Sequence, residues 1–274
     1  MDEERLLKIA NKVRFHIIEM AYQCGGNAHL GGALSLVEIL AVLYGEILHF
    51  NSQFPLLLER DRFILSKGHG VLAYYAILAE MGFFPLTLLK TFQQNGTALV
   101  AHPVMNLKLG IESSNGSLGQ GLSMACGIAL YGKLQEKSYK VYVILGNGEC
   151  NEGAVWEAVM MAAQFKLKNL TVVIDANGMQ SDGNSANIVD LTPFAQKFSA
   201  FGWNVAEVDG HDMKELYSAF SSQNESECPK VVIAKTIKGK GISFMENSIE
   251  WHHNRLTKTL YEQALTELEN KANV

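Results

Sequence analysis

Two short apolar runs, each followed by a small polar loop, constrain the fold of this chain more than any other feature. Residues 141–145 precede Gly146-Asn147-Gly148-Glu149, and residues 170–174 precede Asp175-Ala176-Asn177-Gly178. Short β-branched runs flanked by glycine are typical of buried parallel strands. Residues 152–165, between the two loops, have the length and composition of a helix. The stretch is therefore predicted to be a βαβ unit whose strands each end in a polar loop.

The ends of these two strands are where a ligand is expected. In open α/β sheets, ligands collect outside the carboxyl ends of the strands. Oxygen atoms of Asn147 and Asn177 at adjacent strand ends can share one hard cation, and the N-terminus of the intervening helix offers N–H groups to phosphate. The pattern predicts a site for a cation and a phosphate-bearing ligand.

The other segments continue the alternation of strands and helices. Further strands are predicted at residues 205–208 and 231–235, and helices at residues 4–22, 34–48, 70–81 and 117–134 and in the charged pattern beyond Tyr261. Ser35 is predicted to be the N-cap of the second helix. The alternation predicts an α/β fold with a doubly wound, mainly parallel sheet and helices on both faces. A length of 274 residues suits one such unit, so residues 1–274 are expected to form a single domain.

Composition and charge argue against several classes of protein. Hydrophobic residues make up 48% of the chain and the net charge is −5, which suits a globular protein with an ample core. There is no basic block typical of nucleic-acid binding, no apolar stretch near the roughly 18 residues of a membrane span, and no apolar signal-peptide region after the charged start of the chain. The four cysteines lack CxxC spacing and are expected to be free thiols. We therefore expect a cytoplasmic protein that binds neither nucleic acid nor membrane.

Six motifs in a fixed order resemble those of transketolases, which depend on thiamine diphosphate. The segment from Gly146 to Asn177 resembles the GDG motif that an asparagine follows after roughly 25 to 30 residues. The other motifs are Asn27-Ala28-His29-Leu30-Gly31-Gly32, residues 60–70, His102-Pro103 with residues 112–121, Gly202-Trp203 with Asp209-Gly210-His211-Asp212, and residues 235–241. The resemblance extends over roughly residues 5 to 255 and is to the N-terminal, diphosphate-binding part of a transketolase.

The resemblance implies a partner subunit. The usual chain of the family carries a diphosphate-binding, a pyrimidine-binding and a C-terminal domain, and this sequence matches the first. The chain is thus identified as the N-terminal subunit of a split transketolase, with the other two domains expected on a second chain in an α2β2 assembly. The expected activity is transfer of a two-carbon ketol unit from a ketose, phosphorylated or otherwise anionic, to an aldose. That activity is expected only when the partner subunit is present.

Cofactor and metal residues follow from the same resemblance. The metal, Mg²⁺ or Ca²⁺, is expected on Asn147, Asn177 and the main-chain carbonyl of Met179. Thiamine diphosphate is expected to contact the following residues: His69, Gly116, Ser117, Leu118, Gly146, Gly148, Glu149, Asn177 and His252.

Four histidines and one glutamate are the expected catalytic residues. A lone histidine is most often a satisfied core or surface residue, but His29, His69 and His102 adjoin glycine or proline in loops and match the family's substrate and proton-transfer histidines. His252 resembles a fourth, although a shift of one residue would give its role to His253. Glu152 matches a glutamate that couples paired active sites at the subunit interface. A glutamate in the first turn of a helix is otherwise simply favourable to the helix dipole.

The sequence departs from the family pattern at two places. Asn147 stands where the family has aspartate, which removes one negative charge from the metal site. Asn27, Ala28 and Leu30 replace the serine, glycine and proline around His29. We therefore expect the donor-sugar end of the pocket to differ from that of an ordinary pentose-phosphate transketolase.

Two other interpretations remain open at the level of sequence. The chain could be a catalytically silent scaffold or regulatory homologue, although a scaffold has no need of loop histidines. It could also be a subunit of a related thiamine diphosphate enzyme, similar to 1-deoxyxylulose-5-phosphate synthase or to a dehydrogenase E1 subunit. The former normally has a longer chain, and the set of three histidines favours transketolase.

Overall fold

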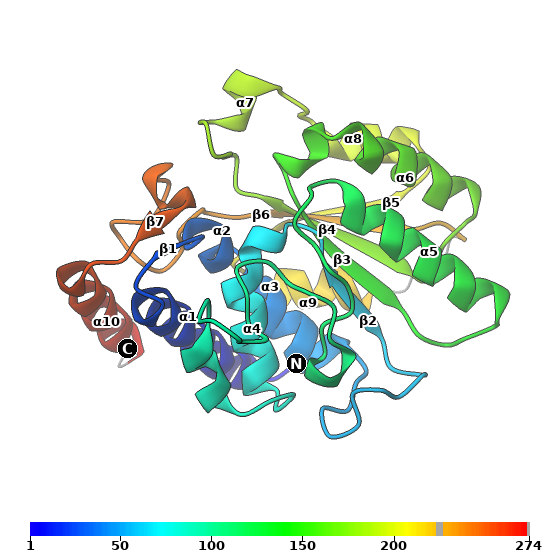
Figure 1. Ribbon diagram of the computed structural model, residues 1–274. Coiled ribbons are helices and arrows are strands. Elements are labelled where there is room, and N and C mark those ends of the chain that lie inside the picture. Colours follow the sequence, from blue (N-terminus) through cyan, green and yellow to red (C-terminus); the bar gives the residue numbers. More distant parts are fainter. Residues whose placement is uncertain (223–226, 273–274) are drawn as a thin grey trace.

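A parallel sheet organises the chain in the computed structural model, which describes residues 1–222 and 227–272 (Figure 1). Its five strands have the order β2-β3-β4-β6-β5, and every neighbouring pair is parallel. The strands are β2 (Arg62–Leu65), β3 (Val141–Gly146), β4 (Leu170–Ala176), β5 (Asn204–Asp209) and β6 (Lys230–Lys235). A separate two-stranded antiparallel ladder joins β1 (Asn27–Ala28) to β7 (Asn254–Arg255).

Helices cover both faces of the sheet. They are α1 (Glu3–Gln23), α2 (Gly31–Leu34), α3 (Val37–Val42), α4 (Val71–Glu80), α5 (Gln120–Leu134), α6 (Gly153–Gln164), α7 (Ser185–Ile188), α8 (Phe194–Ala200), α9 (Met213–Ser221) and α10 (Lys258–Ala272). Short helical turns are the π-helical η1 (Leu43–Ile47) and the 3₁₀ turns η2 (Gly68–Gly70), η3 (Leu86–Thr91), η4 (Leu107–Leu109), η5 (Glu149–Asn151) and η6 (Glu250–His252). In Figure 1, α5, α6 and α8 lie on one side of the sheet and α1, α3, α4 and α9 on the other.

Each strand contributes to two cores because its side chains alternate between the faces. In β3, Tyr142 and Ile144 pack with α1, α3 and α4, whereas Val143 and Leu145 pack with α5, α6 and α8. Since both faces of the strands are buried, the sequence shows continuous apolar runs rather than alternation. The predicted doubly wound, mainly parallel α/β sheet is confirmed.

The predicted helix at residues 34–48 is wrong. The segment is divided into α2, α3 and the π-helical η1, and Ser35 is the C-cap of α2 rather than an N-cap. Its hydroxyl instead donates to Asp175 Oδ2 at 2.7 Å. Residues 34–44 are all buried, so no polar face marks the breaks between these helices in the sequence.

Several elements were not predicted from the sequence. They include the edge strand β2, which has only four residues, and the short helices α8 and α9. The charged tail helix α10 begins at Lys258, before the predicted start. It packs against α1, where Tyr22 and Tyr261 stack with ring centroids 4.1 Å apart.

Within the part of the chain that the structure describes, no helix is both long and apolar enough to span a membrane.

Candidate active site

A cavity of about 340 Å³ lies at the carboxyl edge of the sheet. The loops after β2, β3, β4 and β6 all contribute to its walls, as expected for an open α/β sheet. The structure brings thirteen of the predicted site residues into its lining: His29, His69, His102, Gly116, Leu118, Gly146, Asn147, Gly148, Glu149, Glu152, Asn177, Met179 and His252. Ser117 is the exception, because it is exposed between two lining residues but is not itself part of the lining.

The lining also contains residues that the sequence did not single out as functional. These are Gly32, Lys67, Asn151, Gln180, Ser181 and Lys238. A Cβ at Gly32 would lie 3.2 Å from His69 Cδ2 and 3.4 Å from Lys67 Nζ, so a side chain there would push the His69 ring out of place. The second glycine of the Gly31-Gly32 pair thus lets a catalytic candidate and a buried lysine approach the backbone.

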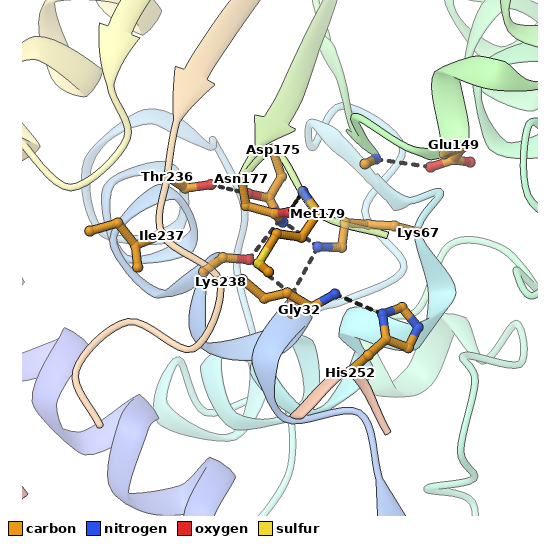
Figure 2. Close-up of polar contacts among 12 residues, drawn as sticks. Gly32, Lys67, Glu149, Asp175, Asn177, Met179, Thr236, Ile237, Lys238 and His252 are labelled. Atoms are coloured by element: carbon orange, nitrogen blue, oxygen red, sulfur yellow. Dashed lines mark hydrogen bonds and ion pairs between the residues drawn. The ribbon is translucent and has the colours of Figure 1, made fainter. Parts of the chain in front are cut away.

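Asp175, the penultimate residue of β4, organises the floor of this cavity. Figure 2 shows Lys67, Asn177 and Thr236 converging on its fully buried carboxylate. Lys67 Nζ lies 2.5 Å and Asn177 Nδ2 3.0 Å from Asp175 Oδ2, and the Thr236 hydroxyl donates to Oδ1. Lys67 Nζ also donates to the Gly32 carbonyl oxygen at 2.9 Å. Asp175 therefore ties together the loops that follow β2, β4 and β6.

The charge of Asp175 is retained by these partners. Burial alone would raise the pKa of the carboxyl group, but the Lys67 charge and the hydrogen bonds from Lys67, Thr236 and Ser35 outweigh burial and hold the pKa below its usual value. The Lys67 and Asp175 side chains are 1% and 0% exposed. Such a pair tolerates burial only while both members are present.

Four imidazole rings gather above this floor. The His29 ring centroid lies 5.5 Å from that of His69, 5.8 Å from His102 and 5.2 Å from His252. Burial, followed by the electrostatic influence of the nearby His253, lowers the pKa of His29 to about 4. Burial, followed by the Lys238 charge, lowers the pKa of His252 to about 3. At neutral pH these two rings are therefore uncharged.

Hydrogen bonds set the tautomers of these two rings. His29 Nδ1 lies 3.0 Å from the His252 carbonyl oxygen, which can only accept, so Nδ1 carries the proton and Nε2 a lone pair. Lys238 Nζ lies 2.8 Å from His252 Nδ1 (Figure 2). Burial, followed by the Lys67 charge, lowers the pKa of Lys238 to about 8, so the ammonium still donates at pH 7 and His252 carries its proton on Nε2. The cavity thus contains one ring that can accept a proton and one that can donate.

Acid should destabilise the protein through these neutral histidines. In the unfolded chain they gain protons below about pH 6.5, whereas His29 and His252 remain neutral in the native state until about pH 4 and pH 3. Because the unfolded state then binds more protons, the free energy of unfolding should fall as the pH drops from about 6.5 through 4. Urea denaturation at several pH values would measure the slope. The His29→Asn/His252→Asn variant should show a shallower slope than the wild type, and equal slopes in the two proteins would contradict the prediction.

The two predicted asparagine ligands lie side by side. One end of the Asn147 amide is 3.2 Å from Asn177 Oδ1 and 3.1 Å from the Asp175 carbonyl oxygen, and its other end is 2.5 Å from Ser185 Oγ. With its nitrogen toward the first pair Asn147 donates to both, and turning the amide over presents a second side-chain oxygen there. Oxygen atoms about 3 Å apart suit the octahedral shell of Mg²⁺, so the donor set fits a hard cation. Among the described residues there is no cluster of three or more His, Cys, Asp or Glu side chains that could hold a metal.

The two glutamates of the candidate site face different environments. Glu149 is buried and accepts hydrogen bonds from Ser66 Oγ at 2.5 Å, Gly119 N at 2.9 Å and Gly146 N at 3.1 Å. Its carboxylate therefore holds the loop after β3 against the end of β2. Glu152 is exposed at the start of α6, and its side chain makes no capping hydrogen bond there.

The other histidines and the cysteines lie outside the cavity. His211 bridges Glu38 Oε2 and the Ile237 N–H at 2.9 and 2.8 Å, so its role is structural. His16 on α1 contacts Glu80, and His49 is exposed just beyond η1. All four cysteines are free thiols, as predicted.

The fold and the cavity define a cofactor-binding α/β domain of the doubly wound class. Residues 6–269 match the family model described as the thiamine diphosphate binding domain of transketolase, so the chain belongs to this family. The large share of the chain that is matched confirms the resemblance that the motifs indicated.

Relatives and solved structures place the chain within that family. It is 42% identical to a 6-deoxy-6-sulfo-D-fructose transketolase subunit of Clostridium sp. (strain MSTE9), over 90% of both chains. It is 39% identical to an apulose-4-phosphate transketolase subunit of Actinobacillus succinogenes, over 98% of this chain and 97% of that one. The crystal structure of Campylobacter jejuni transketolase superposes with a TM-score of 0.91 at 29% identity, over 98% of this chain but 43% of that one. The chain thus spans less than half of that transketolase and nearly all of the two relatives named as subunits.

Proposed function

We propose that this chain is the thiamine diphosphate-binding subunit of a split transketolase that moves a two-carbon ketol unit from an anionic ketose to an aldose. The observation that carries the proposal is the cavity, in which neutral imidazoles of opposite tautomer adjoin the paired amides of Asn147 and Asn177. The names of the two relatives support an anionic sugar, since one refers to a sulfo group and the other to a phosphate.

The proposed roles of the histidines follow from their tautomers. Bound thiamine diphosphate supplies the nucleophilic carbon and the electron sink that carbon–carbon cleavage needs. The lone pair on His29 Nε2 can take the proton of a sugar hydroxyl, and His252 Nε2–H can donate to a sugar oxygen. His69 and His102 complete the ring of groups around the hydroxylated carbons. The carbonyl of Met179 and the amides of Asn147 and Asn177 would hold the metal that neutralises the diphosphate.

The proposed assembly is an α2β2 heterotetramer in the cytoplasm. Residues 1–274 form the single diphosphate-binding domain in this proposal, and the pyrimidine-binding and C-terminal domains belong to the partner subunit. Each cofactor then lies between two chains, and Glu152 at the exposed start of α6 is available to couple paired sites.

Reconstitution tests this function directly. We expect no ketol transfer from the isolated chain with thiamine diphosphate and Mg²⁺, and transfer from a ketose to an aldose once the partner subunit is added. The mass of the co-expressed pair should correspond to two copies of each chain. A stable homo-oligomer of this chain that is active alone would contradict the assembly, and an inactive cofactor-loaded complex would instead identify a silent homologue.

Metal binding should depend on the cofactor because both side-chain ligands are neutral. With no carboxylate among the proposed ligands, little protein charge attracts a cation before the diphosphate arrives. We expect negligible Mg²⁺ or Ca²⁺ affinity without cofactor and strongly interdependent binding of the two. Asn147→Asp should bind metal more readily and keep the fold. Calorimetric titration of both proteins, with and without cofactor, would decide: tight metal binding by the cofactor-free wild type, or weaker binding by the aspartate variant when cofactor is present, would remove Asn147 from the ligand set.

A further inference from the structure

His253 lies opposite His29 across the short antiparallel ladder. In that ladder Asn27 pairs with Arg255 and Ala28 with Asn254. Continuing the register by one step places His29 across from His253, and directly opposed side chains on neighbouring strands lie within contact distance. The two rings are accordingly in contact in a tilted arrangement, with centroids 4.3 Å apart and planes inclined by 31°.

His253 and His252 differ in how their polar atoms are used. The His252 ring is hydrogen-bonded to Lys238, and the main-chain carbonyl oxygen of His252 accepts a hydrogen bond from His29. His252 is therefore held in the wall of the cavity. The His253 side chain is exposed, and among residues 1–222 and 227–272 its ring nitrogens have no hydrogen-bond partner. One histidine of the pair is therefore fixed, and the nitrogens of the other are free for a ligand.

The electrostatic neighbours of His253 place it on the side of the cavity where sugar is expected. After burial, the electrostatic influence of His253 is the next cause of the lowered pKa of both His29 and His102. His29 and His102 line the cavity, and their rings lie 5.8 Å apart. His253 thus lies against His29, a residue of the cavity wall, and near enough to His102 to influence its pKa.

We propose that His253 determines sugar specificity by hydrogen-bonding a hydroxyl group of the ketose at the rim of the cavity. This inference rests on the proposed function and adds a contact from a residue to which no role has been assigned. A free imidazole offers both a donor and an acceptor, which suits a hydroxyl group. Contact with the His29 ring restrains the orientation of the His253 ring, so the hydrogen bond selects among sugars by the position of that hydroxyl.

Direct sugar binding tests the contact without relying on turnover. The complex with the partner subunit is loaded with Mg²⁺ and an unreactive thiamine diphosphate analogue, and titrated with D-fructose 6-phosphate and with D-fructose. We expect His253→Ala and His253→Phe each to raise the dissociation constant of both sugars about tenfold, the scale of one net hydrogen bond. Binding of the analogue should not change, and His49→Ala, which alters an exposed histidine outside the cavity, should bind both sugars normally.

Three outcomes would overturn the inference in different ways. Normal binding by His253→Phe, which keeps an aromatic ring against His29 but has no ring nitrogen atoms, would reduce the role of His253 to packing. A loss confined to the phosphorylated sugar would identify an anion contact instead of a hydroxyl contact. If the unmodified complex neither binds these sugars nor catalyses ketol transfer with thiamine diphosphate, the proposed function fails and the inference fails with it.

Discussion

Alanine at His69 or His102 is expected to lower the turnover of the assembled enzyme by about 10²-fold or more, the usual scale for a lost general acid–base group. Both rings line the cavity within 6 Å of His29, measured between ring centroids. Burial, followed by the Lys67 charge, lowers the pKa of His69 well below its usual value, and burial, followed by His253, lowers that of His102. Neutral rings can exchange protons with sugar hydroxyls, and alanine cannot.

Cofactor affinity separates this role from a structural one. The proposed metal ligands Asn147 and Asn177 are held by Ser185 and Asp175, not by the histidines, so the dissociation constant of thiamine diphosphate should change far less than turnover. Steady-state rates and cofactor titrations of the complex, with His49→Ala as the control, would measure both. Near-normal turnover in either alanine variant would show that the histidine is structural or merely adjacent.

The parts of the site that could be predicted are those that depend on the local order of residues along the sequence. Asn147 and Asn177 each follow a buried β-branched run, and parallel strands place their carboxyl ends at one edge, so their meeting could be predicted. The histidines were predicted from motifs with glycine or proline neighbours. The structure gathers these side chains in one cavity because four strand ends meet there.

The parts that sequence reasoning missed depend on contacts between distant segments. Lys67 and Asp175 are 108 residues apart, and a lysine beside glycine and histidine has no local signal that it is buried. Asp175 was grouped with the polar loop, although it is still part of β4. In the sequence, Lys238 is only one residue of a glycine-rich motif. Its hydrogen bond to His252 becomes evident only when the turn after β6 is folded. The sequence did offer one signal for such buried charged groups, which is a charged residue inside or directly after an apolar strand.

Removing the buried charge partner of Asp175 should have a large effect on stability. We expect Lys67→Met to lower the free energy of unfolding by about 3–5 kcal/mol, because it leaves an uncompensated buried carboxylate. The loss should be largest near neutral pH, where that carboxyl group is ionised, and Lys214→Met, which breaks the exposed pair with Glu3, should change stability little. Chemical denaturation of the isolated chain would measure all three proteins.

A second substitution distinguishes the lost charge from lost packing. If the cost of Lys67→Met comes from the unpaired carboxylate, adding Asp175→Asn should recover part of the lost stability, because an amide is neutral. Ser35 and Thr236 donate to different oxygen atoms of Asp175, so the single amide oxygen keeps one of these two hydrogen bonds. If the cost comes from packing, the two losses should add. An additive result, or a single-variant loss no larger than that of Lys214→Met, would mean that Asp175 does not hold the strand-end loops together by its charge, and the floor of the cavity would need another explanation.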